Sequence, residues 1–381
     1  MARKIMVSAG EASGDLYGAA VVEALRERFP EAEFFGCAGP RMKKAGVEAV
    51  VDAASLSVVG LVEVLAHIPR IYREYRKLCR TAIERRPEVA ILTDSPDFHL
   101  RVARRLRKAG IPVVYLVAPQ VWAWRKGRIH TLRRNVSRLL CIFPFEEKFF
   151  CDNGVPAVYL GHPLARMVKP SLSREEFFGK HRLPTGRPLI ALLPGSRSGE
   201  LARHLPCLLD TVDKLHQTQE LTFVLATPAG AFTRAGLSTL AERLARSPVK
   251  VVEGQTWDVL ASADLALAAS GTVTVEAALL GTPMVTYYKV TGLSWLMGKF
   301  LVDVPFYSMV NLVAGRKIVP ELMQDEMNAE NLAQEARRLL DDEPARSRMR
   351  QELADVAASL ASVEDPMRRA AHFVEQFLKR D

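Results

Sequence analysis

The sequence has few cysteines and none of the usual metal-binding spacings. Its five cysteines include no C-x-x-C pair, and their odd number argues against a disulfide framework and against a zinc ribbon. Its eight histidines include no H-x-x-x-H pair. We therefore expect a reducing compartment, no metal site and no cofactor.

Long hydrophobic runs are missing as well. No run approaches the ~18 uninterrupted apolar residues that suggest a membrane-spanning helix. The first four residues lead into a strand-like run instead of a long apolar segment, so we expect no signal peptide. The 381 residues are 49% hydrophobic and 25% charged, which is ordinary globular usage and excludes wholesale disorder. The length favours two domains.

Acidic residues are absent from one long segment. Residues 98–145 contain eleven Arg and Lys and no Asp or Glu, so the positive charge of this segment alone exceeds the net charge of the whole chain, which is +9. Such a segment favours an anionic partner, which is a nucleic acid, a phosphorylated metabolite or the acidic face of a membrane. The alternative is a solvated helix face that acids elsewhere in the fold balance.

Short apolar runs alternate with amphipathic stretches, which is typical of α/β proteins with parallel sheets. A polar, proline-punctuated stretch at 161–188 interrupts the pattern, which then starts again. We expect two Rossmann-like lobes facing a cleft, 1–168 and 169–381, with 366–381 packing back on the first lobe. The expected strands are 5–9, 34–37, 89–93, 113–117, 139–142, 158–160, 189–193, 223–226, 250–252, 265–268 and 284–286.

Two turns of small residues follow expected strands in the second lobe. Backbone amides in such turns, together with the start of the next helix, suit a phosphate, and an arginine adds a permanent charge. Neither turn has the Gly-Lys-Ser/Thr of a Walker A loop, and ordinary turns and helix caps are the alternatives. A glutamate about one helical turn further on is placed to hold a ribose. The candidates are Gly195, Ser196, Arg197, Ser270, Gly271, Thr272 and Glu276.

The first lobe has its own candidate residues at the ends of strands. Small residues at Gly10, Ser13 and Gly14 leave room for a sugar or head group near the backbone. Asp97 follows the strand 89–93, where α/β proteins place catalytic groups, although a helix-capping role is the alternative. Glu11 is a second acid next to a helix start.

Two further patterns suit an amphiphilic ligand or a membrane surface. Strand-like alternation around Trp122 and Trp124 puts both indoles on one face, as part of a core or as the wall of an apolar site. In residues 61–78, apolar side chains have helical spacing and basic side chains lie beside them, with a new helix start expected at Pro69. This pattern suits a helix at a membrane interface, and a helix that faces the core is the alternative. The candidate membrane or acyl contacts are Leu61, Val62, Leu65 and Ile68.

Taken in order, these segments resemble the lipid-A-disaccharide synthases, glycosyltransferases of the GT-B architecture, over nearly the whole chain. Two positions depart from the family pattern, since Val310 replaces an expected proline and His99 an expected asparagine. The motifs are Gly10-Glu11-Ala12-Ser13-Gly14-Asp15, Asp94-Ser95-Pro96-Asp97-Phe98, residues 119–124, Gly161-His162-Pro163, residues 193–197, Ser270-Gly271-Thr272 with Glu276, and residues 305–324.

The resemblance implies an inverting transfer in lipid A biosynthesis. UDP-2,3-diacylglucosamine gives its sugar to the 6-hydroxyl of 2,3-diacylglucosamine 1-phosphate, which yields a β-1,6 disaccharide 1-phosphate and UDP without a metal. The first lobe then binds the acceptor and its lipid chains, and the second binds the UDP-sugar. Asp97 is the expected base with Glu11 as its substitute, and Asn311 and Gln324 join the UDP-binding residues.

The resemblance also implies partners and a location. We expect contact with the anionic cytoplasmic face of the inner membrane, a homodimer and no nucleic acid. The nearest alternative is another UDP-N-acetylglucosamine enzyme of this fold, a 2-epimerase or a murein-precursor transferase. A non-catalytic basic module that binds lipid or RNA is the alternative of a different class.

Overall fold

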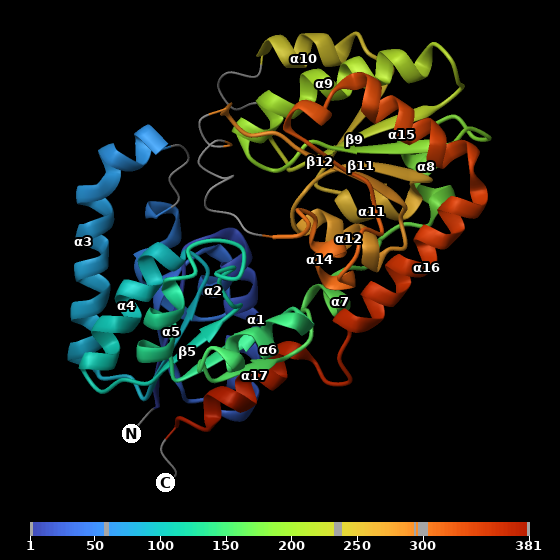
Figure 1. The fold of residues 1–381 in the computed structure, drawn as a ribbon. Helices are drawn as coiled ribbons and strands as arrows, with labels where there is room; N and C mark the ends of the chain where they lie inside the picture. Colours follow the sequence, from blue (N-terminus) through green and yellow to red (C-terminus); the bar gives the residue numbers. More distant parts are fainter. Residues whose placement is uncertain (1–2, 57–60, 232–237, 293–294, 296–303, 379–381) are drawn as a thin grey trace. The chain divides into compact units, whose positions relative to one another are not determined.

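The computed structural model describes residues 3–56, 61–231, 238–292, 295 and 304–378. For residues 61–67 and 238 it describes the backbone alone. The chain divides into two compact units (Figure 1). The first unit is Met1–Pro163 with Leu360–Asp381, and the second is Leu164–Ser359. The division therefore lies at 163/164, where the sequence suggested 168/169, and the chain re-enters the first unit from Leu360 onward.

The first unit is built on a seven-stranded parallel sheet in the order β3-β2-β1-β4-β5-β6-β7. Successive strands lead away from β1 in one direction and from β4 in the other, which is the Rossmann arrangement. The strands are β1 (Lys4–Ala9), β2 (Glu33–Ala38), β3 (Val47–Asp52), β4 (Val89–Thr93), β5 (Val113–Leu116), β6 (Arg138–Cys141) and β7 (Ala157–Tyr159).

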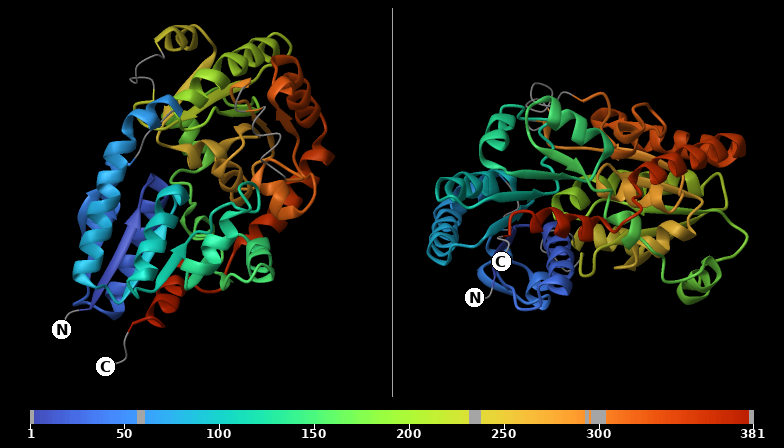
Figure 2. Two further views of the ribbon diagram at one scale, coloured as in Figure 1. Left: turned by 60° about the vertical axis from the view of Figure 1, so that its left-hand side comes forward. Right: turned by 90° about the horizontal axis from the view of Figure 1, so that it is seen from below.

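Helices pack around this sheet in two groups. The first group is α1, α2 and α17, and the second is α3, α4 and α5. The last helix, red in Figure 2, runs beside α1. The helices are α1 (Ala12–Arg28), α2 (Pro40–Lys44), α3 (Leu61–Arg85), α4 (Pro96–Lys108), α5 (Arg128–Asn135), α6 (Pro144–Asp152) and α17 (Pro366–Glu375), with the 3₁₀ turn η1 (Ala53–Ser55).

The second unit repeats the plan with six parallel strands in the order β10-β9-β8-β11-β12-β13. Its strands are β8 (Leu189–Leu193), β9 (Thr222–Thr227), β10 (Val249–Glu253), β11 (Leu265–Ala269), β12 (Met284–Tyr288) and β13 (Glu321–Met323). Its helices are α7 (Leu164–Met167), α8 (Arg174–His181), α9 (Ser198–His216), α10 (Ser238–Ala245), α11 (Thr256–Ser262), α12 (Thr272–Leu279), α14 (Met309–Ala314), α15 (Ala329–Asp341) and α16 (Glu343–Leu360), with the 3₁₀ turn η2 (Gln324–Glu326).

The central strands carry the cores of both units. Every residue of β4 and β8 is buried, because helices cover both faces of a parallel sheet and its strands are apolar throughout. Two parallel-sheet α/β units, the fold class expected from the sequence, are thus confirmed. In the described part of the chain, no helix is long and apolar enough to cross a membrane.

Two local expectations were wrong. The helix α3 continues through Pro69 instead of restarting there, because the fixed φ of proline is that of a helix. The residue still costs one backbone hydrogen bond and crowds the carbonyl four residues earlier. The segment around Trp122 forms turns and not a strand. Its two indoles therefore have separate environments, as described below.

Candidate active site

Most of the residues predicted from the sequence follow four strands at the switch points of the two sheets. In the first unit the order reverses between β1 and β4, and in the second between β8 and β11. Ligands of open α/β sheets bind beyond the carboxyl ends of the strands at such points. The loops after β1 and β4 carry Glu11 and Asp97, and those after β8 and β11 carry Arg197 and Ser270.

Asp94, which directly follows β4, is a central carboxylate that the sequence analysis did not select. Its Oδ1 and Oδ2 accept hydrogen bonds from the backbone amides of Gly10 (2.8 Å) and Glu11 (3.0 Å). Asp94 and Ser95 both have a left-handed backbone, with φ of 53° and 36°, which is a strained conformation typical of functional sites. Burial raises the pKa of Asp94 to about 7.

The backbone of Asp94 is held by two buried side chains. Its carbonyl oxygen accepts hydrogen bonds from the Tyr115 hydroxyl (2.6 Å) and from His99 Nδ1 (3.0 Å). Because a carbonyl only accepts, Nδ1 carries the proton, and Nε2 accepts from the Ser8 hydroxyl at 2.8 Å. Burial lowers the pKa of His99 to about 4, so the ring is neutral near pH 7. The histidine that departs from the family pattern thus fixes the turn at Asp94.

The small residues after β1 serve this carboxylate. A Cβ added to Gly14 would lie 1.7 Å from Asp94 Oδ2, and one added to Gly10 would lie 2.5 Å from Ser95 Oγ. The space that was predicted for a sugar at these two glycines is therefore filled by the Asp94–Ser95 turn. Ser13 and Glu11 are exposed, and their contact with a ligand stays a prediction.

Asp97, the predicted base, is an exposed carboxylate paired with two arginines. Arg125 Nη1 donates to its Oδ1 (2.8 Å) and Oδ2 (3.1 Å), and Arg128 donates to Oδ1 as well. Both guanidinium groups lie over the Trp124 ring, at 4.6 and 5.1 Å from its centroid. Trp122 is buried elsewhere and donates from Nε1 to the Glu146 carboxylate (3.1 Å). Asp97 as the base stays a prediction.

In the second unit, the loop after β8 is organised by Glu200. Its Oε2 accepts the backbone amides of Ser196 (3.0 Å) and Arg197 (3.1 Å), and Gly195 has the positive φ of 108° that this close approach requires. The Tyr288 hydroxyl donates to the other carboxylate oxygen at 3.0 Å. Two of the amides predicted to bind phosphate therefore have an internal partner. The exposed Arg197 guanidinium lies 3.5 Å from Glu200 Oε1, and its contact with an anion stays a prediction.

The loop after β11 leads into the N-terminus of α12. Ser270 is fixed by its hydroxyl, which donates to the Tyr307 carbonyl at 2.7 Å, while Thr272 is exposed. Glu276 is half-buried in the second turn of this helix, and burial raises its pKa while a hydrogen bond from the Trp257 indole opposes the shift. Trp257 is a contact of this site that the sequence analysis missed, since nothing local to residue 257 indicates it.

Asn311 and Gln324 hold the backbone of the second unit. The side chain of Asn311 donates to the Val319 carbonyl and to Glu321, and it accepts the amides of Ile318 and Val319. Gln324 pairs with both backbone groups of Val290. All four hydrogen-bonding positions of Asn311 are thus used inside the fold, and a ligand contact by either residue stays a prediction.

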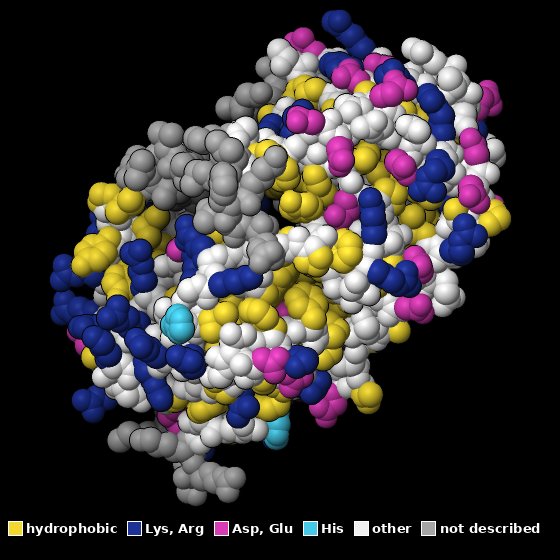
Figure 3. All heavy atoms as spheres, in the orientation of Figure 1, with side chains coloured by type: hydrophobic (Ala, Val, Ile, Leu, Met, Phe, Trp, Pro, Cys, Tyr) yellow, Lys and Arg dark blue, Asp and Glu magenta, His cyan; other side chains and the backbone are white. Residues whose placement is uncertain are grey.

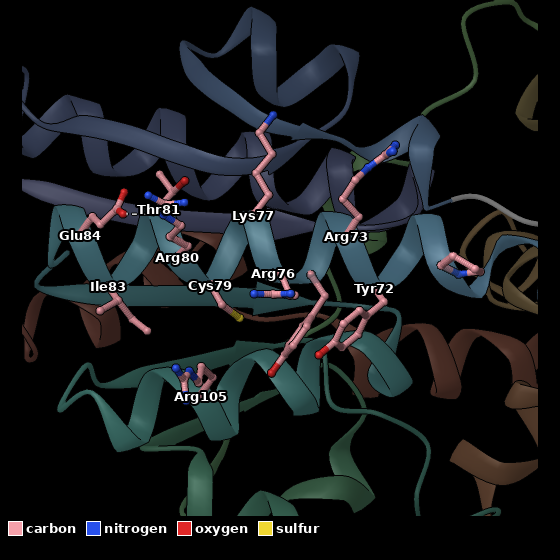
Figure 4. Close-up of a pocket in the computed structure, with 12 residues that line it drawn as sticks. Tyr72, Arg73, Arg76, Lys77, Cys79, Arg80, Thr81, Ile83, Glu84 and Arg105 are labelled. Atoms are coloured by element: carbon pink, nitrogen blue, oxygen red, sulfur yellow. Dashed lines mark hydrogen bonds and ion pairs between the residues drawn. The ribbon is translucent and has the colours of Figure 1, made fainter.

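The surface of α3 and α4 is apolar in one strip and basic around it. Ile68 and Tyr72 are about half exposed, at 50% and 57%, whereas the side chains of Leu61, Val62 and Leu65 lie outside the described residues. Lys and Arg gather over α3, α4 and α5 in Figure 3. A groove of about 1240 Å³ between α3 and α4 is lined by Arg76, Lys77 and Arg105 among others, and Figure 4 shows Tyr72 pointing toward α4.

In the described part of the chain, no three His, Cys, Asp or Glu side chains are grouped so that they could hold a metal ion. The absence of a metal and of a cofactor stays a prediction.

Solved structures share this fold at low sequence identity. A glycosyltransferase from Rickettsia africae superposes with a TM-score of 0.61 at 10% identity and covers 100% of both chains. A UDP-GlcNAc 2-epimerase from Neisseria meningitidis, bound to UDP-GlcNAc, has a TM-score of 0.62 at 12% identity and covers 98% of both chains. These similarities place the chain among GT-B folds and leave its reaction open.

The sequence comparisons are more specific. The family model described as lipid-A-disaccharide synthetase matches residues 5–374. The lipid-A-disaccharide synthase of Solibacter usitatus is 63% identical over 376 residues, which are 99% of this chain and 98% of the relative. That of Myxococcus xanthus is 41% identical over 98% of this chain and 97% of its own length. The chain therefore belongs to the lipid-A-disaccharide synthetase family.

Proposed function

We propose that the protein is a lipid-A-disaccharide synthase, an inverting hexosyltransferase that joins UDP-2,3-diacylglucosamine to 2,3-diacylglucosamine 1-phosphate. The observation that carries this proposal is family membership over nearly the whole chain, with 63% identity to a relative of that name. It also decides against the epimerase and murein-precursor alternatives, which share the fold but belong to other families.

The donor is assigned to the second unit. The Arg197 guanidinium and the N-terminus of α12 at Ser270–Thr272 supply positive charge for the departing diphosphate, and Glu276 is placed to hold the ribose. The hydrogen bond from the Trp257 indole favours the ionised form of the Glu276 carboxylate, since it opposes the rise of its pKa on burial.

The acceptor is assigned to the first unit, where two aspartates compete for the role of base. The base takes the proton of the 6-hydroxyl as that oxygen attacks the anomeric carbon of the donor and the bond to UDP breaks. Asp97, the residue expected from the sequence, has both carboxylate oxygens in hydrogen bonds with guanidinium groups. Asp94 also has both carboxylate oxygens in hydrogen bonds, with the backbone amides of Gly10 and Glu11. Burial raises the pKa of Asp94 to about 7, which suits a base at neutral pH, and on this ground we favour Asp94.

We also assign a peripheral position on the anionic cytoplasmic face of the inner membrane. Support comes from the half-exposed Ile68 and Tyr72 next to cations such as Arg76 and Lys77, because a basic surface around an apolar strip suits an anionic leaflet. The homodimer expected from the family is retained as part of the proposal.

The decisive experiment is an assay of the purified protein in neutral detergent. We expect UDP and a β-1,6 disaccharide 1-phosphate, identified by mass spectrometry and NMR, from the acylated UDP-glucosamine and the acylated acceptor. Unacylated UDP-glucosamine serves as the comparison and should react far more slowly. If the acylated pair gives no disaccharide, or if UDP-N-acetylglucosamine is epimerised instead, the proposed function is wrong.

A further inference from the structure

A cavity of about 1050 Å³ opens beside the loop after β4, within the first unit. One wall of the cavity is an apolar strip of α3 that includes Ile68, Ile71 and Tyr72. The opposite wall is α4, with Arg101 and Arg104. The end of the cavity is formed by Asp97 and Trp124 together with Glu11 and Ser95. Its size is that of a small-molecule site, and its opposed apolar and cationic walls suit an amphiphile with a negative head group.

Arg125 and Arg128 contact the residues at the end of this cavity. Both guanidinium groups donate to Asp97 and stack on Trp124, and these contacts fix their planes. Arg125 also has a left-handed backbone with a φ of 54°, a strained conformation that a bulky residue adopts rarely. Contacts with Asp97 and Trp124, and not burial, hold the Arg125 guanidinium, since its side chain is 48% exposed.

The charges of this cluster do not balance. The two guanidinium groups share the carboxylate of Asp97 as their ion-pair partner, and the segment that carries the arginines contains no acid. The cavity lining adds one more carboxylate, Glu11, and several more cations, among them Arg101 and Arg104. Asp97 engages only one terminal nitrogen of each guanidinium group, and the other N–H donors have no acceptor among the described residues. A phosphate monoester carries about −1.5 to −2 charge at pH 7 and matches the fork of N–H donors.

We propose that Arg125 and Arg128 form the subsite for the anomeric phosphate of the acceptor. Asp97 holds the two guanidinium groups in place while the subsite is empty, and the acyl chains lie along the apolar strip of α3. The subsite makes the enzyme selective for a phosphorylated acceptor. This inference rests on the proposed function and assigns the part of the acceptor that the first unit recognises.

The test compares two acceptors in neutral detergent, where no phospholipid supplies a competing phosphate. One is 2,3-diacylglucosamine 1-phosphate, and the other is the same sugar with a methoxy group in place of the phosphate. In the unaltered protein we expect kcat/KM to be on the order of 10–100-fold higher for the phosphorylated acceptor, as expected for hydrogen bonds to a charged group. In Arg125→Gln and Arg128→Gln that ratio should fall toward one, with the loss confined to the phosphorylated acceptor.

Three controls separate the outcomes. Arg107→Gln, on the exposed surface of α4 and outside the cavity lining, should keep the ratio. Equal losses with both acceptors in the Arg125 and Arg128 variants overturn the proposal, as does a collapse of the ratio in Arg104→Gln alone. If a glutamine variant does not fold, Arg125→Lys and Arg128→Lys keep the charge but lose the fork, and an unchanged ratio in both overturns the proposal. A failure of the unaltered protein to form any disaccharide contradicts the proposed function instead.

Discussion

The carboxylate of Asp94 depends on partners that come from separate parts of the first unit. Its oxygens accept amides of the β1 loop, and its carbonyl is held by the Tyr115 hydroxyl of β5 and the His99 ring of α4. Gly14 leaves the space that the side chain occupies. The same burial that fixes the group raises its pKa to about 7. Position and proton affinity thus have a common origin in the packing of the loop.

Substitution of the two aspartates tests which of them is the base. We expect Asp94→Asn to lower kcat on the order of 10²–10⁴-fold while the affinity for UDP, measured by calorimetry, stays unchanged. Asp97→Asn should show the same collapse if the sequence-based prediction holds. Near-normal turnover of Asp97→Asn removes that residue from the role, and near-normal turnover of Asp94→Asn removes the one that its raised pKa favours.

The pKa of Asp94 predicts the pH dependence of the reaction. A base must be ionised, and the ionised fraction of a carboxyl with a pKa of about 7 falls tenfold for each pH unit below that value. We expect kcat/KM to decrease as the pH is lowered through about 7. A pH–rate profile that is flat from pH 8 down to pH 5 would contradict the assignment. The neutral His99, with a pKa of about 4, does not ionise in this range.

Among the elements, α14 and β13 show how a predicted binding residue can have a structural task. Asn311 of α14 uses its amide to hold Ile318, Val319 and Glu321, which lead into and begin the edge strand β13. Glu321 in turn accepts the amides of Tyr307 and Ser308. The side chain is fully buried, so its loss leaves several polar groups without partners.

Asn311→Ala should therefore destabilise the protein by about 3 kcal/mol or more. Urea unfolding followed by circular dichroism measures this effect. The matched control is Asn153→Ala at the exposed end of α6, which should change stability by less than about 0.5 kcal/mol. A stable Asn311→Ala variant with weakened UDP binding would show that the residue contacts the ligand, as the sequence analysis predicted.

For the whole molecule, the net charge of +9 is unevenly distributed. The cations of α3, α4 and α5 form a basic surface around the half-exposed Ile68 and Tyr72. Arg76 and Lys77 have no ion pair within the described residues. Attraction to an anionic leaflet is about 1 kcal/mol for each such charge and is screened by salt.

Co-sedimentation with vesicles that contain an anionic phospholipid tests this surface. We expect binding that weakens as the salt concentration rises, and Arg76→Glu with Lys77→Glu should weaken it further. The control Arg246→Glu with Lys250→Glu changes two exposed cations of the second unit by the same total charge and should bind like the unaltered protein. Equal losses in both double variants, or binding that salt does not affect, would contradict the assignment.

The sequence by itself determined the central strands, the two α/β units and the loops at the switch points, because buried parallel strands are continuous apolar runs with local turn residues after them. It missed the edge strands β3 and β13, since a half-exposed or three-residue strand lacks such a run. Only the tertiary structure decided that Asp94 binds the amides after β1, that Glu200 binds the amides after β8, and that Arg125 and Arg128 meet on Asp97. These contacts join residues on different elements, and burial and hydrogen bonding across such distances leave no local pattern in the chain.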